Sequence, residues 1–270
     1  MRIVSWNCNG ALRNKVAQLD ALDADLLIIQ ECEDPALASA DYRKWAGAYL
    51  WKGSNKHKGI GVFPKKGNTV CALDWYRSFS LTGIASAGAA TTWTTNDLEL
   101  FLPFKLNGKE TILSVWTKGD DSRVFSYIGQ LWKYLCVHQS DLSTPKTLIV
   151  GDFNSNTIWD KTDRWWNHSD VVRQLASLGL NSLYHIKTAS AHGKEATPTL
   201  YLQRNRDKPY HVDYAFASAD ILPKCDIQIG RADEWLDSSD HMPLTLNINS
   251  EIRRTNAATP TNHPNFSPVR

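Results

Sequence analysis

Lys146-Thr-Leu-Ile-Val-Gly-Asp-Phe-Asn154 joins an apolar run to two polar side chains, and this segment carries most of the fold prediction. The unbroken apolar run up to Gly151 is typical of a strand that is buried on both faces of a sheet. Asp152 and Asn154 follow at the end of that strand. Open α/β sheets place their functional sites beyond the carboxyl ends of their strands. The segment therefore predicts the position of a site as well as a strand.

Other apolar runs along the chain have polar side chains in similar positions. These are Asn7 after residues 2–6, Glu31 after residues 25–30, Asp213 within residues 212–218, and Asp240 with His241 before residues 244–248. Carboxylates and carboxamides are unfavourable when they are buried without partners. Their recurrence beside buried strands therefore indicates that they contribute to one functional site.

The rest of the chain adds helices and hairpins to these strands. Helices are expected at 12–22, at 122–139 with Asp121 or Ser122 as the N-cap, and at 169–178. Further strands are expected at 58–63, 69–75 and 79–85, with one hairpin joining 98–106 to 111–115 and another joining 199–203 to 212–218. This mixture predicts an α/β protein with one mixed sheet or two packed sheets.

Composition and charge narrow the class of protein. The chain has 270 residues, of which 42% are hydrophobic and 21% charged, and this is ordinary for a globular protein. The formal net charge of +2 comes from three Arg and one Glu in residues 251–270, so residues 1–250 are neutral overall. An overall basic surface that binds nucleic acid indiscriminately is therefore excluded, and any phosphate-binding surface must be local.

Cysteine spacing and hydropathy predict a cytoplasmic protein. The five cysteines are scattered without a Cys-x-x-Cys pair, which favours reduced thiols over disulfides or a zinc site. The N-terminal residues lack the pattern of a signal peptide, and no apolar run approaches the ~20 residues of a membrane span. We expect one folded domain at 1–250 and a disordered tail at 251–270, which is rich in Asn, Thr and Pro.

The polar side chains beside the strands suit a hard metal ion. Mg²⁺ prefers oxygen ligands and keeps several waters, so it needs only one or two protein carboxylates. The nitrogen- and sulfur-rich sets typical of zinc are missing. Each residue taken alone also has a structural explanation. Asn7 could form a turn, and Glu31 could end a strand in solvent. Asp152 or Asp240 could cap a turn or helix, and Asp213 could face solvent. Their joint occurrence in this order favours a site.

Five segments together resemble the endonuclease/exonuclease/phosphatase superfamily, whose members are similar to exonuclease III and DNase I. They are Ser5-Trp-Asn7, Gln30-Glu31, Gly151-Asp-Phe-Asn154, His211-Val-Asp-Tyr214 and Ser239-Asp-His241. The resemblance implies an α/β, DNase I-like fold, which is a four-layer sandwich of two packed mixed β-sheets flanked by helices. Residues 1–250 would then form a single catalytic domain with its site at one edge of the two sheets.

The same resemblance implies a metal site. Glu31 would be the principal ligand of Mg²⁺, for which Mn²⁺ could substitute. Asn7 would lie beside Glu31, and Asp240 would complete the site as a further metal ligand.

It also implies catalytic roles for four residues. Asp152 would orient or deprotonate the attacking water, and Asn154 would hold a phosphate oxygen. His241 would contact the scissile phosphate. Asp213 would orient the His241 ring and favour its protonated form. A neighbouring carboxylate favours protonated histidine, so the Asp213–His241 pair would supply a cationic donor near pH 7.

One position departs from the family pattern. Exonuclease III-like members carry Tyr, and the DNase I-like branch carries His, at the end of the strand where this chain has Trp116. Trp donates one N–H but cannot accept, ionise or shuttle a proton, so the leaving-group role of that position does not transfer to it. Trp116 would either stack on a base or sugar of the substrate or pack in the core. The following segment, 118–121, also lacks the Asn of abasic-site enzymes, which argues against that specific activity.

Basic side chains outside the motifs are candidates for substrate binding. Lys118 follows Trp116 closely, and Arg204 and Arg206 lie at the tip of an expected hairpin. The alternative is that these are ordinary solvated loop charges.

We therefore expect a Mg²⁺-dependent phosphodiester hydrolase, a DNA endonuclease or exonuclease that acts on single-stranded or damaged DNA and has no membrane partner. The alternative is a phosphodiesterase or phosphatase acting on a small molecule or lipid headgroup, which the neutral charge and Trp116 favour. A binding module without catalysis is a third class. The suitable residues at every motif position argue against it.

Overall fold

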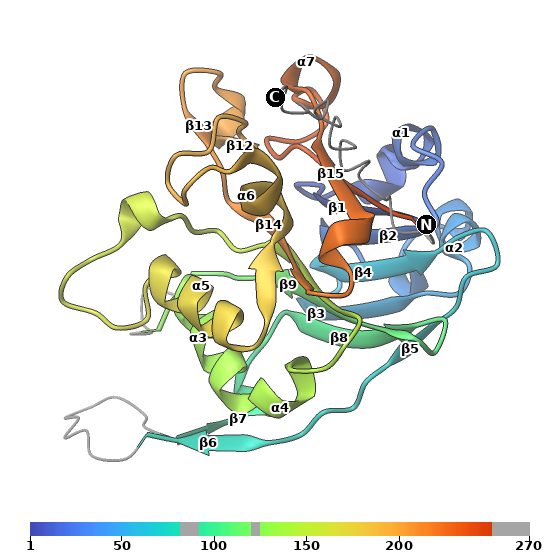
Figure 1. Ribbon diagram of the computed structural model, residues 1–270. Coiled ribbons are helices and arrows are strands. Elements are labelled where there is room, and N and C mark those ends of the chain that lie inside the picture. The colour runs from blue at the N-terminus through green and yellow to red at the C-terminus, as the bar shows by residue number, and fades with distance from the viewer. Residues whose placement is uncertain (82–91, 120–124, 250–270) are drawn as a thin grey trace, which may run out of the picture.

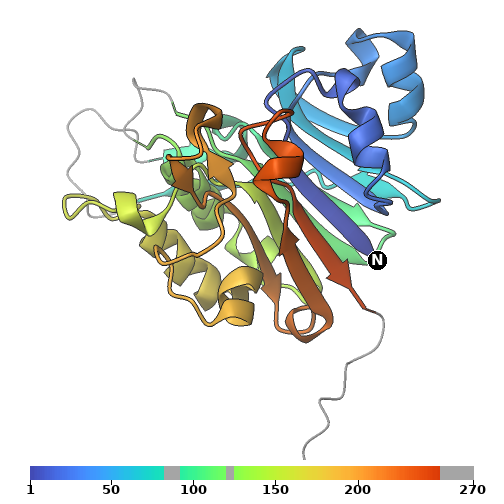
Figure 2. The ribbon, with the colours of Figure 1, turned by 90° about the horizontal axis from the view of Figure 1, so that it is seen from above.

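A computed structural model describes residues 1–81, 92–119 and 125–249, and in it two mixed six-stranded sheets pack face to face (Figure 1). Viewed from above, helices cover the outer face of each sheet, so the molecule has four layers (Figure 2). This arrangement confirms the predicted α/β sandwich.

The first sheet contains both the first and the last strand of the described chain. Its order is β15 (Cys225–Ile229), β16 (Leu244–Ile248), β1 (Arg2–Asn7), β2 (Leu26–Cys32), β4 (Lys58–Pro64) and β3 (Leu50–Asn55). Only the β1–β2 pair is parallel among these neighbours. The chain ends of β1 and β2 therefore lie at the same edge of the sheet.

The second sheet is built in the same way around one parallel pair, β9 and β10. Its order is β11 (Leu180–Ser182), β14 (Asp213–Ser218), β10 (Thr147–Asp152), β9 (Glu110–Trp116), β8 (Phe101–Leu106) and β5 (Val70–Ala72). Two small hairpins stand apart from the sheets: β6 (Ser78–Ser80) with β7 (Thr92–Thr94), and β12 (Leu200–Tyr201) with β13 (Pro209–Tyr210).

Short helices cover the sheets. The α-helices are α1 (Val16–Asp20), α2 (Ala40–Ala46), α3 (Ile128–Val137), α4 (Gln139–Leu142), α5 (His168–Ser177), α6 (Leu183–Thr188) and α7 (Ala232–Trp235). The 3₁₀ helices are η1 (Leu12–Asn14), η2 (Pro35–Leu37), η3 (Thr95–Asp97), η4 (Thr157–Trp159), η5 (Leu202–Arg204) and η6 (Leu222–Lys224). Within the described residues, no helix is long and apolar enough to cross a membrane.

Alternation along β10 explains why its sequence is apolar throughout. Leu148 and Val150 lie in the core between the two sheets, whereas Ile149 packs with α3 and α5 on the outer face. Strand β2 is divided in the same way, since Ile28 faces the other sheet and Ile29 faces the outer cluster that includes residues of α1 and α2. Strands covered on both faces carry continuous apolar runs, so the sandwich accounts for the pattern.

The structure corrects three expectations. The helix predicted at 12–22 is divided into η1 and α1, because Lys15 has a non-helical backbone (φ −123°, ψ 3°) and its ammonium bonds to Gly10 O at 2.8 Å. The strands predicted at 69–75 and 79–85 shorten to β5 and β6 in the described part. The helix predicted at 122–139 is α3 and α4, separated at His138.

The predicted hairpin between 199–203 and 212–218 is wrong. Strand β14 pairs instead with β10 and β11, and β12 forms its own small hairpin with β13. Every residue of β14 is buried, because the other sheet covers one of its faces and helices cover the other, and in the sheet it lies between β10 and β11. The N-cap proposed at Asp121 or Ser122 and the tail at 251–270 lie outside the described residues, so the domain boundary at 250 stays a prediction.

Candidate active site

One edge of each sheet contributes polar side chains to a single cluster. Asn7 is the last residue of β1, and Glu31 is the next-to-last residue of β2. In the second sheet, Asp152 ends β10 and lies opposite Asp213, the first residue of β14. Asn7 Nδ2 donates a hydrogen bond to Asp152 Oδ2 over 2.9 Å, so the two sheets are joined directly at this edge. The strand ends picked out from the sequence therefore meet.

Two of the site residues have a left-handed backbone. Glu31 has φ of 61° and lies at a β-bulge of β2, and Asn154 has φ of 44° just beyond β10. Residues other than glycine rarely adopt this conformation, and such strain is concentrated at functional sites. The bulge turns the Glu31 carboxylate toward Asn7, whose Nδ2 donates to Glu31 Oε1 over 3.1 Å. Lys58 forms an ion pair with the same carboxylate.

Asp152 is fully buried, and amide donors surround its carboxylate. Besides the bond from Asn7, the backbone N–H of Asn154 donates to Oδ1 over 2.8 Å and the Asn154 side chain donates to Oδ2 over 2.9 Å. Asn154 Nδ2 also donates to Thr117 O over 2.9 Å. These bonds fix the orientation of both side chains, and donors directed at a carboxylate favour its charged form.

Asp213 and His241 form the other half of the cluster. His241 Nδ1 lies 2.9 Å from Asp213 Oδ2, and its Nε2 lies 3.9 Å from Asp152 Oδ2. The backbone of His241 is fixed as well, because its carbonyl accepts from Trp6 Nε1 over 2.8 Å and its N–H donates to Ser239 Oγ over 3.0 Å. With Nδ1 engaged by Asp213, Nε2 is the ring nitrogen that faces Asp152.

The charges of these groups depend on one another. Burial lowers the pKa of His241, but the nearby carboxylates of Asp213 and Asp152 outweigh that effect and raise it. Burial raises the pKa of Asp152, and the charge of Asp213 adds to the rise, while His241 opposes it. A carboxylate with a raised pKa is a better proton acceptor at neutral pH, and a protonated imidazole is a hydrogen-bond donor. The cluster therefore holds an acceptor and a cationic donor side by side.

The donor set fits a hard divalent cation. Ligand atoms of Asp152, Asp213 and His241 lie within 4.8 Å of one another. The Glu31 carboxylate borders this group and is linked to Asp152 by hydrogen bonds from Asn7 Nδ2, so the candidate ligand atoms other than that of His241 are carboxylate oxygens, as Mg²⁺ prefers. Asp240, the further ligand predicted from the sequence, is half-buried and accepts from Asn9 Nδ2 over 3.0 Å.

A second group of possible ligands lies elsewhere. His185, His192 and Glu195 also offer ligand atoms within 4.8 Å of one another. Glu195 already accepts from His185 Nε2 over 2.9 Å and from Asn156 Nδ2 over 3.1 Å. The sequence analysis missed this group, because no motif links a helix end to the loop that follows it.

A model of the endonuclease/exonuclease/phosphatase family matches residues 4–241, a span that contains the whole cluster around Asp152. The chain belongs to this family. Members of the family are phosphoric-ester hydrolases that generally depend on a divalent metal. A comparison with curated proteins gives no match.

Solved structures of other proteins share the fold. The 3′–5′ exonuclease from Neisseria meningitidis is 18% identical, with a TM-score of 0.63 over 92% of this chain and 100% of that one. An AP endonuclease from Archaeoglobus fulgidus is also 18% identical, with a TM-score of 0.60 over 92% of this chain and 99% of that one. An AP endonuclease from Leishmania major is 16% identical, with a TM-score of 0.60 over 91% and 86%. The family fold is thus DNase I-like, as expected.

Trp116 stands where other members of the family carry Tyr or His, and the structure shows what it does. Its side chain is 5% exposed and packs in the core between the sheets, although its backbone lies next to Asp152 in the β9–β10 pair. This burial favours packing over stacking on substrate, and a contact of Trp116 with substrate stays a prediction.

The other predicted substrate contacts lie on the surface. Lys118 is exposed two residues after Trp116, and its carbonyl accepts from Tyr127 N over 3.2 Å. Arg204 and Arg206 are exposed in the loop between β12 and β13, and Arg204 donates to Ser238 O over 3.4 Å. The structure therefore places Lys118 and the two arginines on different elements, and their contact with substrate stays a prediction.

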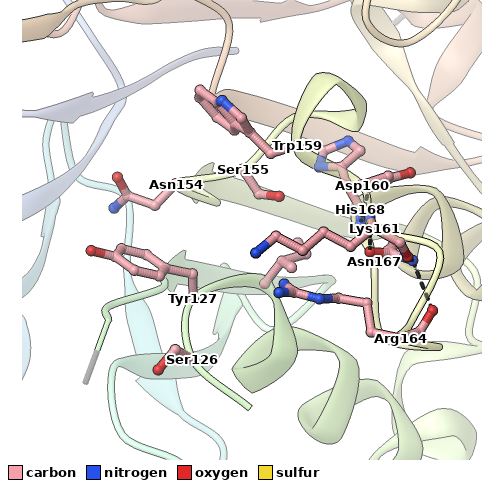
Figure 3. Close-up of a pocket in the computed structure, with 11 residues that line it drawn as sticks. Ser126, Tyr127, Asn154, Ser155, Trp159, Asp160, Lys161, Arg164, Asn167 and His168 are labelled. Atoms are coloured by element: carbon pink, nitrogen blue, oxygen red, sulfur yellow. Dashed lines mark hydrogen bonds between the residues drawn. The ribbon is translucent and has the colours of Figure 1, made fainter. Parts of the chain in front are cut away.

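The sequence analysis also missed a pocket of about 580 Å³ that includes Asn154 in its lining (Figure 3). Its other walls carry Tyr127, Trp159, Lys161 and Arg164, which come from the start of α3 and from the segment between β10 and α5. No short motif marks these residues. The only signal was the density of Trp and basic residues at 159–166.

Proposed function

We propose that the chain is a Mg²⁺-dependent phosphodiester hydrolase that cuts DNA. The observation that carries this proposal is the cluster at the joined sheet edges, where Asp152 and His241 face each other and Glu31 lies beside Asn7. This arrangement combines a proton acceptor, a cationic donor and an oxygen-rich cation site, which are the groups that hydrolysis of a phosphodiester needs.

In the proposed mechanism each side chain has one task. Asp152 orients a water for in-line attack on phosphorus and accepts its proton, while the bond from phosphorus to the leaving oxygen breaks and that oxygen takes a proton from solvent. Asn154 holds the Asp152 carboxylate in place through its side chain and its backbone N–H. The His241 imidazolium donates from Nε2 to another phosphate oxygen, and Asp213 holds the ring and its charge. A divalent cation held by Glu31 and Asn7, with Asp240 as a further ligand, would neutralise charge on the phosphoryl group.

Two observations support DNA as the substrate. The solved relatives include a 3′–5′ exonuclease and AP endonucleases, and one described as a 3′ phosphatase is bound to a product DNA hairpin. The pocket beside Asn154 adds exposed aromatic and basic side chains next to the cluster. Neutral charge over residues 1–250 favours a second candidate, a phosphodiesterase that acts on a small molecule.

The test compares wild type with Asp152→Asn on single-stranded DNA, duplex DNA, abasic duplex, RNA and bis-p-nitrophenyl phosphate. We expect cutting of DNA with Mg²⁺ or Mn²⁺, no cutting with EDTA, and a loss of at least about 10³-fold in the variant. Asp237→Asn, at an exposed carboxylate, is the matched control. A thermal melt of each variant checks that it is folded.

Other results would redirect or contradict the proposal. Metal-dependent hydrolysis of bis-p-nitrophenyl phosphate alone would favour the small-molecule phosphodiesterase. Wild-type and Asp152→Asn proteins of equal activity would contradict the role of Asp152, and absence of hydrolysis on every substrate would contradict the proposed function.

A further inference from the structure

The pocket next to Asn154 has unpaired positive charge. Lys161 is exposed and Arg164 is half-buried, and within the described residues neither side chain forms an ion pair. Both extend into the pocket, toward the side where Tyr127 and Asn154 lie (Figure 3). The acidic residue of the lining, Asp160, is engaged elsewhere, since it accepts from the backbone N–H groups of His168 and Ser169 over 2.9 and 3.3 Å. The lining therefore has a net positive charge, because Lys161 and Arg164 outnumber its one carboxylate, and the Arg164 guanidinium also lies over the Trp166 ring, 5.9 Å from its centroid.

Two aromatic rings of the pocket are exposed although they are large. The side chain of Tyr127 is 47% exposed and that of Trp159 is 43% exposed. Trp159 packs on Tyr210, with ring centroids 5.1 Å apart, so its ring is supported from behind. Tyr127 is anchored by its backbone bond to Lys118. Exposed rings beside cationic side chains are the combination by which proteins bind single-stranded nucleic acid, through base stacking and phosphate contact.

The position of the pocket relates it to the catalytic cluster. Asn154 belongs to both, because its side chain bonds to Asp152 and also lines the pocket. A group bound in the pocket would therefore lie beside the scissile phosphate. The volume of about 580 Å³ is within the range of small-ligand sites, roughly 300–1,000 Å³.

We infer that this pocket binds one nucleotide of the substrate strand next to the phosphodiester that is cut. The base stacks on Tyr127 or Trp159, and its phosphate is paired with Lys161 and Arg164, the guanidinium providing two parallel donors. A base held in this way cannot remain stacked and paired inside a duplex. The inference rests on the proposed function and deepens it, because it makes single-stranded or unpaired DNA the preferred substrate.

The test measures binding separately from catalysis. A fluorescein-labelled single-stranded oligonucleotide is titrated in EDTA, where hydrolysis does not occur, and its anisotropy is followed for wild type and for Lys161→Ala, Arg164→Ala and Tyr127→Ala. Loss of a stacking ring weakens single-strand binding by roughly 5- to 100-fold, and we expect Tyr127→Ala to fall in this range. Loss of one phosphate contact lowers the slope of log affinity against log salt by about 0.7. We expect this change for Lys161→Ala and Arg164→Ala.

Lys109→Ala is the matched control, because Lys109 is exposed in the β8–β9 turn, at the opposite end of β9 from Trp116. It should bind as wild type does, with an unchanged salt slope. Thymidine diphosphate has a base and phosphates, as a nucleotide within a strand does. Competition with it therefore tests whether the pocket prefers a free nucleotide or a nucleotide within a strand. We expect the unlabelled strand to compete at lower concentration than the diphosphate.

Three results would overturn the inference: pocket variants that bind as the Lys109→Ala control does, a blunt duplex that binds as tightly as the single strand, or competition by the diphosphate alone. Failure of the proposed function is a different result. In that case no diester is hydrolysed with Mg²⁺ or Mn²⁺, whereas the binding measurements in EDTA still give their own answer.

Discussion

Asp213 is the carboxylate that both orients His241 and makes the largest contribution to its positive charge. It lies 2.9 Å from His241 Nδ1, and both side chains are buried, so no solvent screens the pair. Asp213→Asn should lower the pKa of His241 and reduce kcat on DNA by about 10²- to 10³-fold. Asp237→Asn should leave kcat unchanged. The measurement is kcat with a thermal melt for each variant, and equal kcat for Asp213→Asn and wild type would contradict the role.

Trp116 provides a second test at the scale of one residue. If its ring packs between the sheets, Trp116→Phe should lower the free energy of unfolding by about 1–3 kcal/mol, because a smaller ring leaves a cavity. If the indole packs in this way, it has little surface to offer a substrate, and the KM for single-stranded DNA should change by less than about twofold. Urea unfolding and steady-state kinetics measure the two quantities. A large rise in KM at unchanged stability would support stacking on the substrate instead.

Strands β9 and β10 approach each other closely enough at Gly151 that no other residue fits there. Gly151 has φ of 143°, and a Cβ at this position would lie 2.0 Å from Val115 O. Gly151→Ala should therefore separate the strands, displace Asp152 and destabilise the protein by more than about 3 kcal/mol. Gly108 is a matched control because its φ is 67° but a Cβ there would meet nothing within 4 Å.

Gly108→Ala should cost only about 1 kcal/mol, which is the backbone penalty without a clash. Urea unfolding of both variants gives the comparison. Similar losses of stability for the two variants would show that the close approach of β9 and β10 is not what requires glycine at position 151.

At the scale of elements, the sequence predicted strands better than it predicted their partners. The apolar run at 146–151 and the turn Asn107-Gly108 gave β10 and the β8–β9 hairpin directly, because each depends on local sequence. The predicted pairing of β14 was wrong, because the nearness of residues 199–203 in the sequence favoured a hairpin with them. Its interior place in the sheet depends on burial between two layers, which a single sequence does not display.

At the scale of the whole molecule, buried histidines should make folding sensitive to acid. His168 is 1% exposed and both its ring nitrogens lack partners in the described structure. Burial lowers the pKa of His168 to about 3, and burial with nearby histidines lowers that of His192 to about 4. In the unfolded chain the histidine pKa is about 6.5, so between that pH and the folded values only the unfolded chain takes up protons.

Stability should consequently fall as the pH is lowered from about 6.5 toward 4. A buried histidine such as His168 accounts for a loss of about 2 kcal/mol by pH 5. His168→Phe should remove this part of the pH dependence, whereas His57→Phe, at an exposed turn position, should retain it. Urea unfolding at pH 7 and pH 5 is the measurement. Equal pH dependence for His168→Phe and wild type would contradict the assignment.

The gathering of polar side chains around Asp152 could be predicted from the sequence, because the motifs that contain them are short and each lies at the end of a strand or just before one. Asn7, Glu31, Asp152, Asn154, Asp213 and His241 all contribute to the same edge. The pocket could not be predicted, because Tyr127 and Lys161 are brought together by the path of two loops. No periodicity or spacing in the sequence encodes that path. The burial of Trp116 could not be predicted either, because it depends on the space between the two sheets.

The order of strands in the first sheet has a consequence for synthesis of the protein. Strand β1 lies between β2 and β16, and Trp6 near the end of β1 donates to the carbonyl of His241. During synthesis, β1 thus has one edge uncovered until β16 follows it, more than 230 residues later. Unpaired strand edges promote association between chains. A chain stalled before residue 241 would therefore lack His241 and also expose the middle of its first sheet to other chains.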